Sequence, residues 1–299
     1  MTSSFWDCAI IGAGPAGMTA ATYLGRFLRR TLVIDDGESR MRRIPTTRNV
    51  PGFPDGIAGE ALYMRLHAQA ERYGAMLSTG RIERILFVDG GFQLATAEQT
   101  YAAHTVLLAT GAQLSEPDID CLDEGVARGV IRYCPICDAY EARGRRIAVL
   151  AGRPGAISEA VFLRRYSESI ALLWTMDGRP TQQDLQTAEQ HGIDVAEQAV
   201  QGLQFDQRGS TSLGDGRSFD VVYVCFGCAP RSALAASLGA RLSGEGGVVV
   251  DRHQRTSVPG LYAAGDVLQG LDQIASACGQ AAIAATAMHN DLRAWEGKP

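Results

Sequence analysis

Hydrophobic and polar residues follow one another along the first part of the chain in an order that predicts a strand, a helix and a second strand. An apolar run at Cys8–Ile11 predicts the first strand, and helical spacing follows at Met18–Leu28. A second apolar strand is predicted at Thr31–Asp35. Because the two strands are joined through a helix, they are predicted to lie parallel in one sheet.

The same pattern returns near the middle of the chain. Strands are predicted at Arg146–Leu150 and Ile170–Trp174, with a helix at Ile157–Tyr166 between them. Two such units predict an α/β protein with two Rossmann-like, three-layer domains.

The remaining pattern indicates how the two domains share the chain. A buried strand is predicted at Asp220–Phe226, another strand at Gly247–Val250, and a long helix from Gln273 to Leu292. The first domain is therefore predicted to be split, with residues 1–113 and 243–299 forming one domain. The inserted domain is predicted at residues 114–242.

Composition narrows the possible functions. The chain has 299 residues, of which 46% are hydrophobic and 20% charged, and its formal net charge is −5. This charge gives no bulk attraction to nucleic acid or to anionic membranes. No apolar run reaches the roughly 18 residues that a membrane helix needs, and no secretory signal is visible. We therefore expect a cytoplasmic protein without nucleic-acid or membrane partners.

The first strand leads directly into a GxGxxG loop at residues 12–17. Gly12 permits a tight turn, Gly14 lets the backbone approach a pyrophosphate, and Gly17 lets the helix pack closely on the strand. Asp35 ends the next strand, where a carboxylate accepts hydrogen bonds from an adenosine ribose. The loop in this position predicts dinucleotide binding.

A second chemical motif is the segment CPICD at residues 134–138. Cys134 and Cys137 are spaced to close a small disulfide ring, and Asp138 is placed to move a proton to or from a thiolate. Two other interpretations stay open: half of a zinc site completed by Cys225 and Cys228, or cysteines with only a structural role. We favour the redox disulfide and predict no metal site.

Five motifs together give the chain a resemblance to a known family. They are GAGPAGMTAATYL, NVPGFPDGIAGEAL, LLATG, CPICD and LYAAGDV, in that order over nearly the whole chain. The chain resembles the low-molecular-weight thioredoxin reductases. The resemblance implies FAD in the split domain, NADPH and the CxxC disulfide in the insert, and a homodimer.

The resemblance also implies a role for individual residues. Cys134 would exchange with the partner, Cys137 would be the thiol next to the flavin, and Asp138 would be the acid–base group. The helix that begins near Gln273 would direct its N-terminus at the flavin, although Asp272 stands where the family has arginine. The implied FAD-binding residues are Gly12, Gly14, Pro15, Ala16, Gly17, Asp35, Asn49, Gly111, Gly265, Asp266, Gln273 and Ile274.

The second glycine loop departs from the family pattern. Where the family has GGGDSA, this chain has AGRPGA at residues 151–156. Arg153 replaces the glycine that meets the pyrophosphate, and Pro154 removes an amide donor. The following segment, Trp174–Met176, offers neither a carboxylate for NADH nor an arginine pair for NADPH, and Arg179 is the nearest cation. We predict that the nicotinamide site is lost; the alternative is a variant that still binds NADPH.

Loss of NADPH binding leaves several routes for the electrons. One is a ferredoxin that supplies FAD, with a thioredoxin-like protein as the disulfide partner. Another is a small dithiol that reduces the CxxC pair, with dioxygen accepting electrons from the flavin. A third, without turnover, is a flavin redox sensor. We favour the ferredoxin-supplied reductase.

Overall fold

The computed structural model describes residues 5–118, 122–153, 155–200, 204–205, 211–212 and 217–297. The chain forms two compact units. Unit 1 comprises Met1–Thr46, Val50–Gln113 and Ala229–Pro299, and unit 2 comprises Thr47–Asn49 and Leu114–Cys228. The segments that link them include β7 (Ala112–Leu114) and β16 (Cys228–Pro230), which pair in a two-stranded sheet.

The second domain boundary lies earlier than the sequence suggested. We expected the return to the first domain at residue 243, but unit 1 resumes at Ala229. Helix α7 (Ala233–Ser237) follows directly, and Ala235 and Ala240 are buried in the core of unit 1. The short alanine-rich helix gave no strong amphipathic signal, so its burial was not evident from the sequence.

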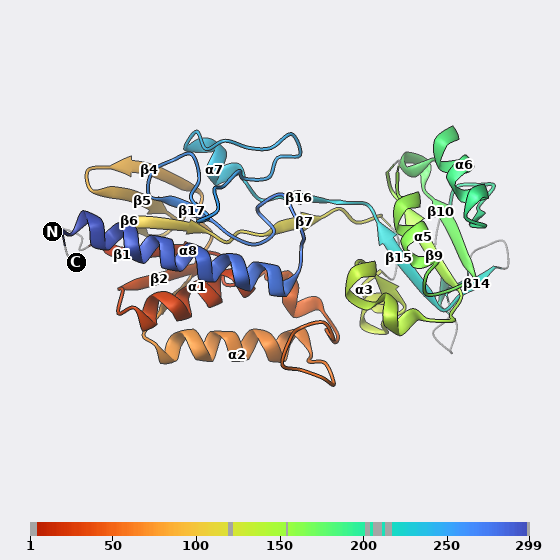
Figure 1. Ribbon diagram of the computed structural model, residues 1–299, viewed down its shortest axis with the longest axis horizontal. Helices are drawn as coiled ribbons and strands as arrows, with labels where there is room; N and C mark the ends of the chain where they lie inside the picture. The colour runs from red at the N-terminus through yellow and green to blue at the C-terminus, as the bar shows by residue number, and fades with distance from the viewer. Residues whose placement is uncertain are drawn as a thin grey trace. The chain divides into compact units, whose positions relative to one another are not determined.

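Unit 1 is built on one sheet with strand order β3-β2-β1-β6-β5-β4, and β17 pairs with β6 (Figure 1). The parallel strands carry the predicted strand–helix–strand unit at their centre, where Ile10 is paired with both Val33 and Leu107. The strands are β1 (Trp6–Ile11), β2 (Thr31–Asp35), β3 (Met76–Thr79), β4 (Arg84–Val88), β5 (Gly91–Ala95), β6 (Thr100–Leu108) and β17 (Leu261–Ala263).

Helices α1 (Pro15–Arg26) and α8 (Ile274–Trp295) bury their apolar side chains, including Met18, Leu24 and Met288, in one core of unit 1. Helix α2 (Gly59–Arg72) and the 3₁₀ turn η1 (Arg40–Arg43) complete its helical elements together with α7. The strand predicted at Gly247–Val250 does not form: Val248 makes only isolated bridges with Leu242 and Leu268.

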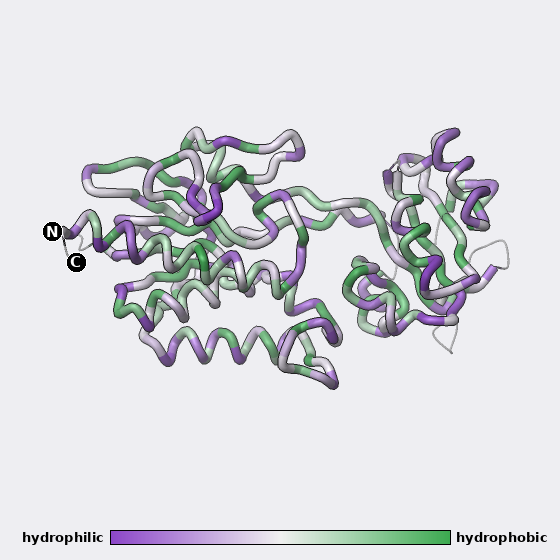
Figure 2. Tube along the Cα trace, viewed as in Figure 1, coloured by the Kyte–Doolittle hydropathy of each residue, from purple (hydrophilic) through white to green (hydrophobic). Residues whose placement is uncertain are grey.

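Unit 2 holds a five-stranded parallel sheet in the order β11-β10-β9-β15-β8. In Figure 2 its central strands are mainly hydrophobic, whereas helix α6 (Gln182–Gln190) is mainly hydrophilic. The strands are β8 (Ile131–Arg132), β9 (Ile147–Ala151), β10 (Ile170–Trp174), β11 (Asp194–Val195) and β15 (Val221–Cys225). A small antiparallel sheet contains β12 (Gln204–Phe205), β13 (Thr211–Ser212) and β14 (Ser218–Phe219).

The remaining elements of unit 2 cover or border this sheet. Helix α5 ends at Leu163 rather than at the predicted Tyr166. The elements are α3 (Leu122–Ala127), α4 (Pro135–Asp138), η2 (Ala139–Ala142), α5 (Ile157–Leu163) and η3 (Met176–Gly178). The predicted α/β fold with parallel strands is confirmed in both units, and in unit 1 the strands β4, β5 and β6 add antiparallel pairs to the sheet.

Candidate active site

The first glycine loop is tightly packed at its two ends and open in the middle. A Cβ atom on Gly12, whose φ is +102°, would lie 2.3 Å from the carbonyl oxygen of Ala109. A Cβ atom on Gly17 would lie 1.8 Å from the carbonyl oxygen of Gly12. On Gly14 the nearest atom would be the Ser39 Oγ at 3.5 Å. The loop therefore leaves backbone surface open to a phosphate group at Gly14.

Two helices begin at this end of the sheet. Gly14 is the N-cap of α1, with Pro15 in its first turn, and Gln273 is the N-cap of α8, which starts at Ile274. The Cys278 Sγ in the second turn of α8 lies 3.9 Å from the Pro15 carbonyl oxygen, and a Cβ atom on Gly265 would lie 3.1 Å from the Ala16 Cβ and 3.6 Å from the Ala277 Cβ, so the two helices are neighbours near their N-termini. Helix N-termini attract anions through unpaired amides and the helix dipole, and here two of them converge.

Asp35 lies at the carboxyl end of β2 and supports the loop. Its Oδ1 accepts a hydrogen bond from the Ala13 amide at 2.8 Å, and its Oδ2 accepts one from the Gly37 amide at 2.9 Å. A carboxylate retains further lone pairs for a ribose. The His67 ring Nε2 lies 3.2 Å from the Ala13 carbonyl oxygen, a contact to the loop that no sequence signal marked.

The Gly265-Asp266 turn joins the same end of unit 1. A Cβ atom on Gly265 would lie 3.1 Å from the Ala16 Cβ, and the Gly265 amide donates to the Gln280 Oε1 at 2.8 Å. Burial, with a smaller contribution from Asp272, raises the pKa of Asp266 to about 6. The Arg40 Nη1 lies 3.4 Å from the Asp266 Oδ2 and opposes this shift.

Two further predicted residues have simple local surroundings. Gly111 has a φ of +68° and nothing within 4 Å of an added Cβ, and its carbonyl oxygen accepts from the Arg231 amide at 2.9 Å. Asn49 accepts a hydrogen bond from the Thr47 hydroxyl at 3.0 Å. Both residues keep their implied FAD-binding role as a prediction.

These features fit the ADP portion of a dinucleotide. An open glycine backbone, two adjoining helix N-termini and a strand-end carboxylate match the chemistry of pyrophosphate and ribose. Asp266 is a largely buried carboxylate suited to hydroxyl donors. The residues of unit 1 therefore fit FAD.

Cys134 and Cys137 form a disulfide in unit 2, with Cα atoms 5.3 Å apart. Cys134 is the N-cap of the one-turn helix α4, and the Cys137 amide donates to the Cys134 carbonyl oxygen at 3.0 Å. Between them Ile136 is 57% exposed, so the turn is open to solvent. The disulfide argues against the zinc interpretation, since Cys225 is buried and Cys228 is exposed.

Asp138 follows the disulfide and enters a polar cluster. Its Oδ1 accepts a hydrogen bond from the Tyr223 hydroxyl at 2.7 Å, and the Arg132 Nη1 lies 3.7 Å from the same oxygen. Burial raises the pKa of Asp138, and both Arg132 and Tyr223 oppose that rise. Burial and the neighbouring Asp138 also raise the pKa of Tyr223. No signal in the sequence marked Arg132 or Tyr223 as a partner of Asp138.

The second glycine loop has side chains where the first loop is open. A Cβ atom on Gly152 would lie 2.1 Å from the Phe226 ring, so the ring rests on the loop backbone. The Arg153 Nη2 lies 3.3 Å from the Glu159 Oε1 in the first turn of α5. Pro154 lies outside the described residues. The position expected to meet a pyrophosphate therefore carries an arginine paired within the protein.

The segment after β10 is also occupied by internal contacts. The Trp174 Nε1 donates to the Ala196 carbonyl oxygen at 2.8 Å, and the Arg179 guanidinium carbon lies 5.9 Å from the centre of the Trp174 ring. Arg179 is the cation that the sequence offered for a 2′-phosphate, and it stacks on Trp174.

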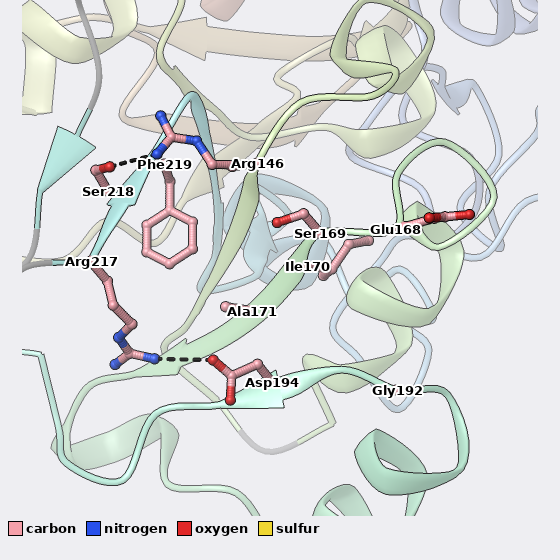
Figure 3. A pocket seen from close by; sticks show the side chains of 10 residues that line it. All are labelled: Arg146, Glu168, Ser169, Ile170, Ala171, Gly192, Asp194, Arg217, Ser218 and Phe219. Carbon is pink, nitrogen blue, oxygen red and sulfur yellow. Dashed lines mark hydrogen bonds and ion pairs between the residues drawn. The ribbon is translucent and has the colours of Figure 1, made fainter.

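A cavity of about 340 Å³ in unit 2 lies away from this loop (Figure 3). It is bordered by the amino ends of β10 and β11, whereas the glycine loop follows the carboxyl end of β9. Three of its charged side chains have partners: Arg146 donates to Ser218 at 2.7 Å, and Arg217 donates to Asp194 at 3.5 Å (Figure 3). The cavity is therefore separate from the expected nucleotide position.

Comparison with known proteins identifies the family. Residues 6–281 match the family described as pyridine nucleotide-disulphide oxidoreductase. The chain belongs to this family. The oxidoreductase is 33% identical to a thioredoxin reductase of Listeria innocua over 296 residues, covering 93% of this chain and 91% of the relative. It is 29% identical to a thioredoxin reductase of Bacillus subtilis over 300 residues, covering 95% and 94%.

Solved structures agree with these relatives. The crystal structure of a thioredoxin reductase from Streptococcus pyogenes matches with a TM-score of 0.88 and 27% identity, covering 98% of this chain and 100% of that one. The oxidoreductase is thus an FAD-dependent disulfide oxidoreductase of the thioredoxin reductase type. In the described part of the chain, no helix is both long and apolar enough to span a bilayer.

Proposed function

We propose that this oxidoreductase uses its reduced Cys134–Cys137 pair to reduce the disulfide of a thioredoxin-like protein, and that it receives its electrons from a donor other than NADPH. The observation that carries the exchange is the disulfide itself, which closes an exposed one-turn helix beside a buried carboxylate. The thioredoxin reductases among its relatives support the choice of partner.

The exchange uses this chain's own thiols. The Cys134 thiolate attacks one sulfur of the partner disulfide, which forms a mixed disulfide and releases the partner's first thiolate. The Cys137 thiolate then attacks the Cys134 Sγ, which closes the Cys134–Cys137 disulfide and releases the partner's second thiolate. Asp138 takes the proton that Cys137 loses and returns it to a departing thiolate. The partner gains two electrons; one of its thiols takes the proton carried by Asp138, and the other takes a proton from solvent.

FAD, when bound, supplies the two-electron carrier that returns the Cys134–Cys137 pair to the dithiol form. In unit 1, the open Gly14 backbone and the first turns of α1 and α8 would hold the pyrophosphate. Asp35 would hold the ribose of the adenosine, and Asp266 would accept from hydroxyl groups of the remaining chain.

Three contacts support a donor other than NADPH. Arg153 occupies the pyrophosphate position and is paired with Glu159, whose negative charge repels phosphate. The Phe226 ring covers Gly152. Trp174 and Arg179 stack where the family carries a basic cluster. A reduced ferredoxin is the donor that we propose.

The proposal is tested by trapping the partner. In Cys137→Ser, Cys134 has no resolving thiol, so a thioredoxin disulfide should remain covalently attached. Non-reducing electrophoresis and mass spectrometry detect the adduct, and Cys228→Ser, which changes an exposed cysteine elsewhere, should form none. Absence of an adduct in Cys137→Ser contradicts the exchange. Hydrogen peroxide production from a small dithiol in air, without reduction of thioredoxin, would replace the proposal by a dithiol oxidase.

A further inference from the structure

Asp138 is held by two residues from separate strands of the sheet in unit 2. Arg132 ends β8, Tyr223 is central in β15, and the two are paired neighbours in the parallel register. Residues paired in this way project from the same face of a sheet. Tyr223 and Asp138 are 85 residues apart in the sequence, so only the fold brings them together.

Tyr223 reaches Asp138 from inside the apolar core. It is 0% exposed, and it packs in the cluster that also contains Ala139 and Ala142, directly after the CPICD segment. A buried phenol needs a hydrogen-bond partner, and the Asp138 Oδ1 at 2.7 Å provides it. Since the pKa of the phenol is raised, Tyr223 keeps its proton and donates it in this bond.

Arg132 contacts both the backbone and the carboxylate of Asp138. Its Nη1 donates to the Asp138 carbonyl oxygen at 2.9 Å and lies 3.7 Å from the Asp138 Oδ1. Its Nε donates to the Gly129 carbonyl oxygen at 3.1 Å, which orients the guanidinium plane. Arg132 is itself largely buried, with 14% of its side chain exposed, so the attraction is only weakly screened.

We propose that Tyr223 and Arg132 are positioning residues that hold the Asp138 carboxylate in one orientation and keep it ionised for proton exchange at the neighbouring Cys137. The inference rests on the proposed thiol–disulfide exchange and adds the two groups that make Asp138 usable in it.

The charged and titratable groups around Asp138 determine the direction of the effect. Burial raises the pKa of its carboxyl and is the largest influence. Arg132 from β8 and Tyr223 from β15 lower the pKa, while Glu141 from η2 raises it. Removing the hydroxyl of Tyr223 or the charge of Arg132 therefore leaves the effect of burial less opposed, and the pKa of Asp138 rises.

The test measures the titration midpoint of the Asp138 carboxyl group directly. The holoenzyme is labelled with aspartate carrying ¹³C in the side-chain carboxyl, and its signals are followed by NMR during a pH titration. Asp138→Asn identifies the signal. Tyr223→Phe and Arg132→Gln should each move the titration midpoint of Asp138 upward by about one pH unit. Tyr166→Phe removes a phenol hydroxyl from the same core and should leave the midpoint unchanged.

A second readout links the shift to chemistry. The rate at which dithiothreitol reduces the Cys134–Cys137 disulfide is measured across pH by alkylating the released thiols. In Tyr223→Phe and Arg132→Gln, the pH at which protonation of Asp138 changes the reduction rate should rise by the same amount as the NMR midpoint. Two unmoved midpoints in Tyr223→Phe and Arg132→Gln overturn the inference, even if both variants are less stable. The NMR midpoint is measured without a partner protein, so failure of the partner-trapping experiment is a separate result.

Discussion

The two glycine loops of this oxidoreductase each follow a parallel strand at the centre of a sheet, yet they present different surfaces. In unit 1, close backbone packing leaves no room for a side chain at Gly12 or Gly17, whereas a Cβ atom on Gly14 would contact only the Ser39 Oγ, at 3.5 Å. In unit 2, Arg153 stands in the position equivalent to Gly14 and is paired with Glu159. Phe226 covers the adjoining Gly152.

The comparison shows that the residues needed for strand–helix packing differ from those needed to bind a phosphate group. Unit 2 keeps the strand–helix–strand packing, with Ala151 and Ala156 both buried in its core. What differs is the position equivalent to Gly14, where Arg153 places a side chain that is paired with Glu159. The proposed loss of the nucleotide site would leave the fold of unit 2 intact, because packing and phosphate binding depend on different residues of the loop.

The largest expected effect concerns the function that unit 2 retains. Cys134→Ser and Cys137→Ser should each lower the rate of disulfide exchange roughly a thousandfold or more, because either change removes a reacting sulfur. Flavin absorbance should stay unchanged, since neither cysteine is among the residues that the family resemblance implies for FAD binding. Steady-state assays and absorption spectra measure the two properties, and Cys228→Ser is the control. Turnover at the native rate in either variant contradicts the account.

Gly14→Arg makes the first loop resemble the second. We expect bound FAD to fall about tenfold or more, because the new side chain enters the pyrophosphate path. The fold should survive, since a Cβ atom on Gly14 meets nothing closer than 3.5 Å. Flavin content per protein and circular dichroism measure these effects.

Gly14→Ala is the graded control for this substitution and should lose less flavin than Gly14→Arg. Full flavin occupancy in Gly14→Arg would show that the open backbone at Gly14 is not the phosphate site.

Asp266 gives unit 1 a pH dependence of stability. Its pKa is raised from 3.8 to about 6, so the folded protein binds this proton more tightly than the unfolded chain. Its stabilising contribution is complete below about pH 4 and is lost as the pH rises through about 6. Asp266→Asn should therefore raise the free energy of unfolding at neutral pH by about 1 to 2 kcal/mol relative to the native protein.

Urea unfolding at acidic and neutral pH, with equal flavin content in both proteins, measures this difference. At acidic pH the two proteins should differ little. A native protein whose stability rises between about pH 4 and pH 6 relative to Asp266→Asn contradicts the prediction.

The smallest expected effect is on the second loop. Ala151→Gly combined with Arg153→Gly should change NADPH affinity less than about threefold, because the loop glycines are only part of a nucleotide site. Phe226 still covers Gly152, and the Trp174 segment still lacks a phosphate-binding cluster. Equilibrium dialysis measures the affinity. A large gain would show that Arg153 alone closes the site.

Local sequence signals predicted the first loop and the disulfide correctly as structural features. Gly17 packs against the nearby Gly12 in the same loop, and Cys134 and Cys137 are separated by three positions in the sequence. Such arrangements depend on spacing along the chain, which a sequence shows directly.

The contacts that the sequence did not reveal join distant segments. Tyr223 lies within an apolar strand, where an aromatic residue is ordinarily interpreted as core, and its hydroxyl meets a carboxylate 85 residues away. Phe226 covers Gly152 for the same reason: β15 and β9 are neighbours in the sheet but not in the chain. The observed boundary at Ala229 lies earlier than the expected residue 243. The helix α7 between them buries alanines, which give only a weak periodic hydrophobic signal in the sequence.

An anaerobic titration tests the central claim most directly. The purified holoenzyme is titrated separately with NADPH, with NADH and with dithiothreitol, and bleaching of the flavin absorption is followed. The account predicts that dithiothreitol bleaches the flavin through the Cys134–Cys137 pair, and that neither nicotinamide nucleotide does so at stoichiometric amounts. Rapid bleaching by stoichiometric NADPH would contradict it and would show that the second loop still binds the nucleotide.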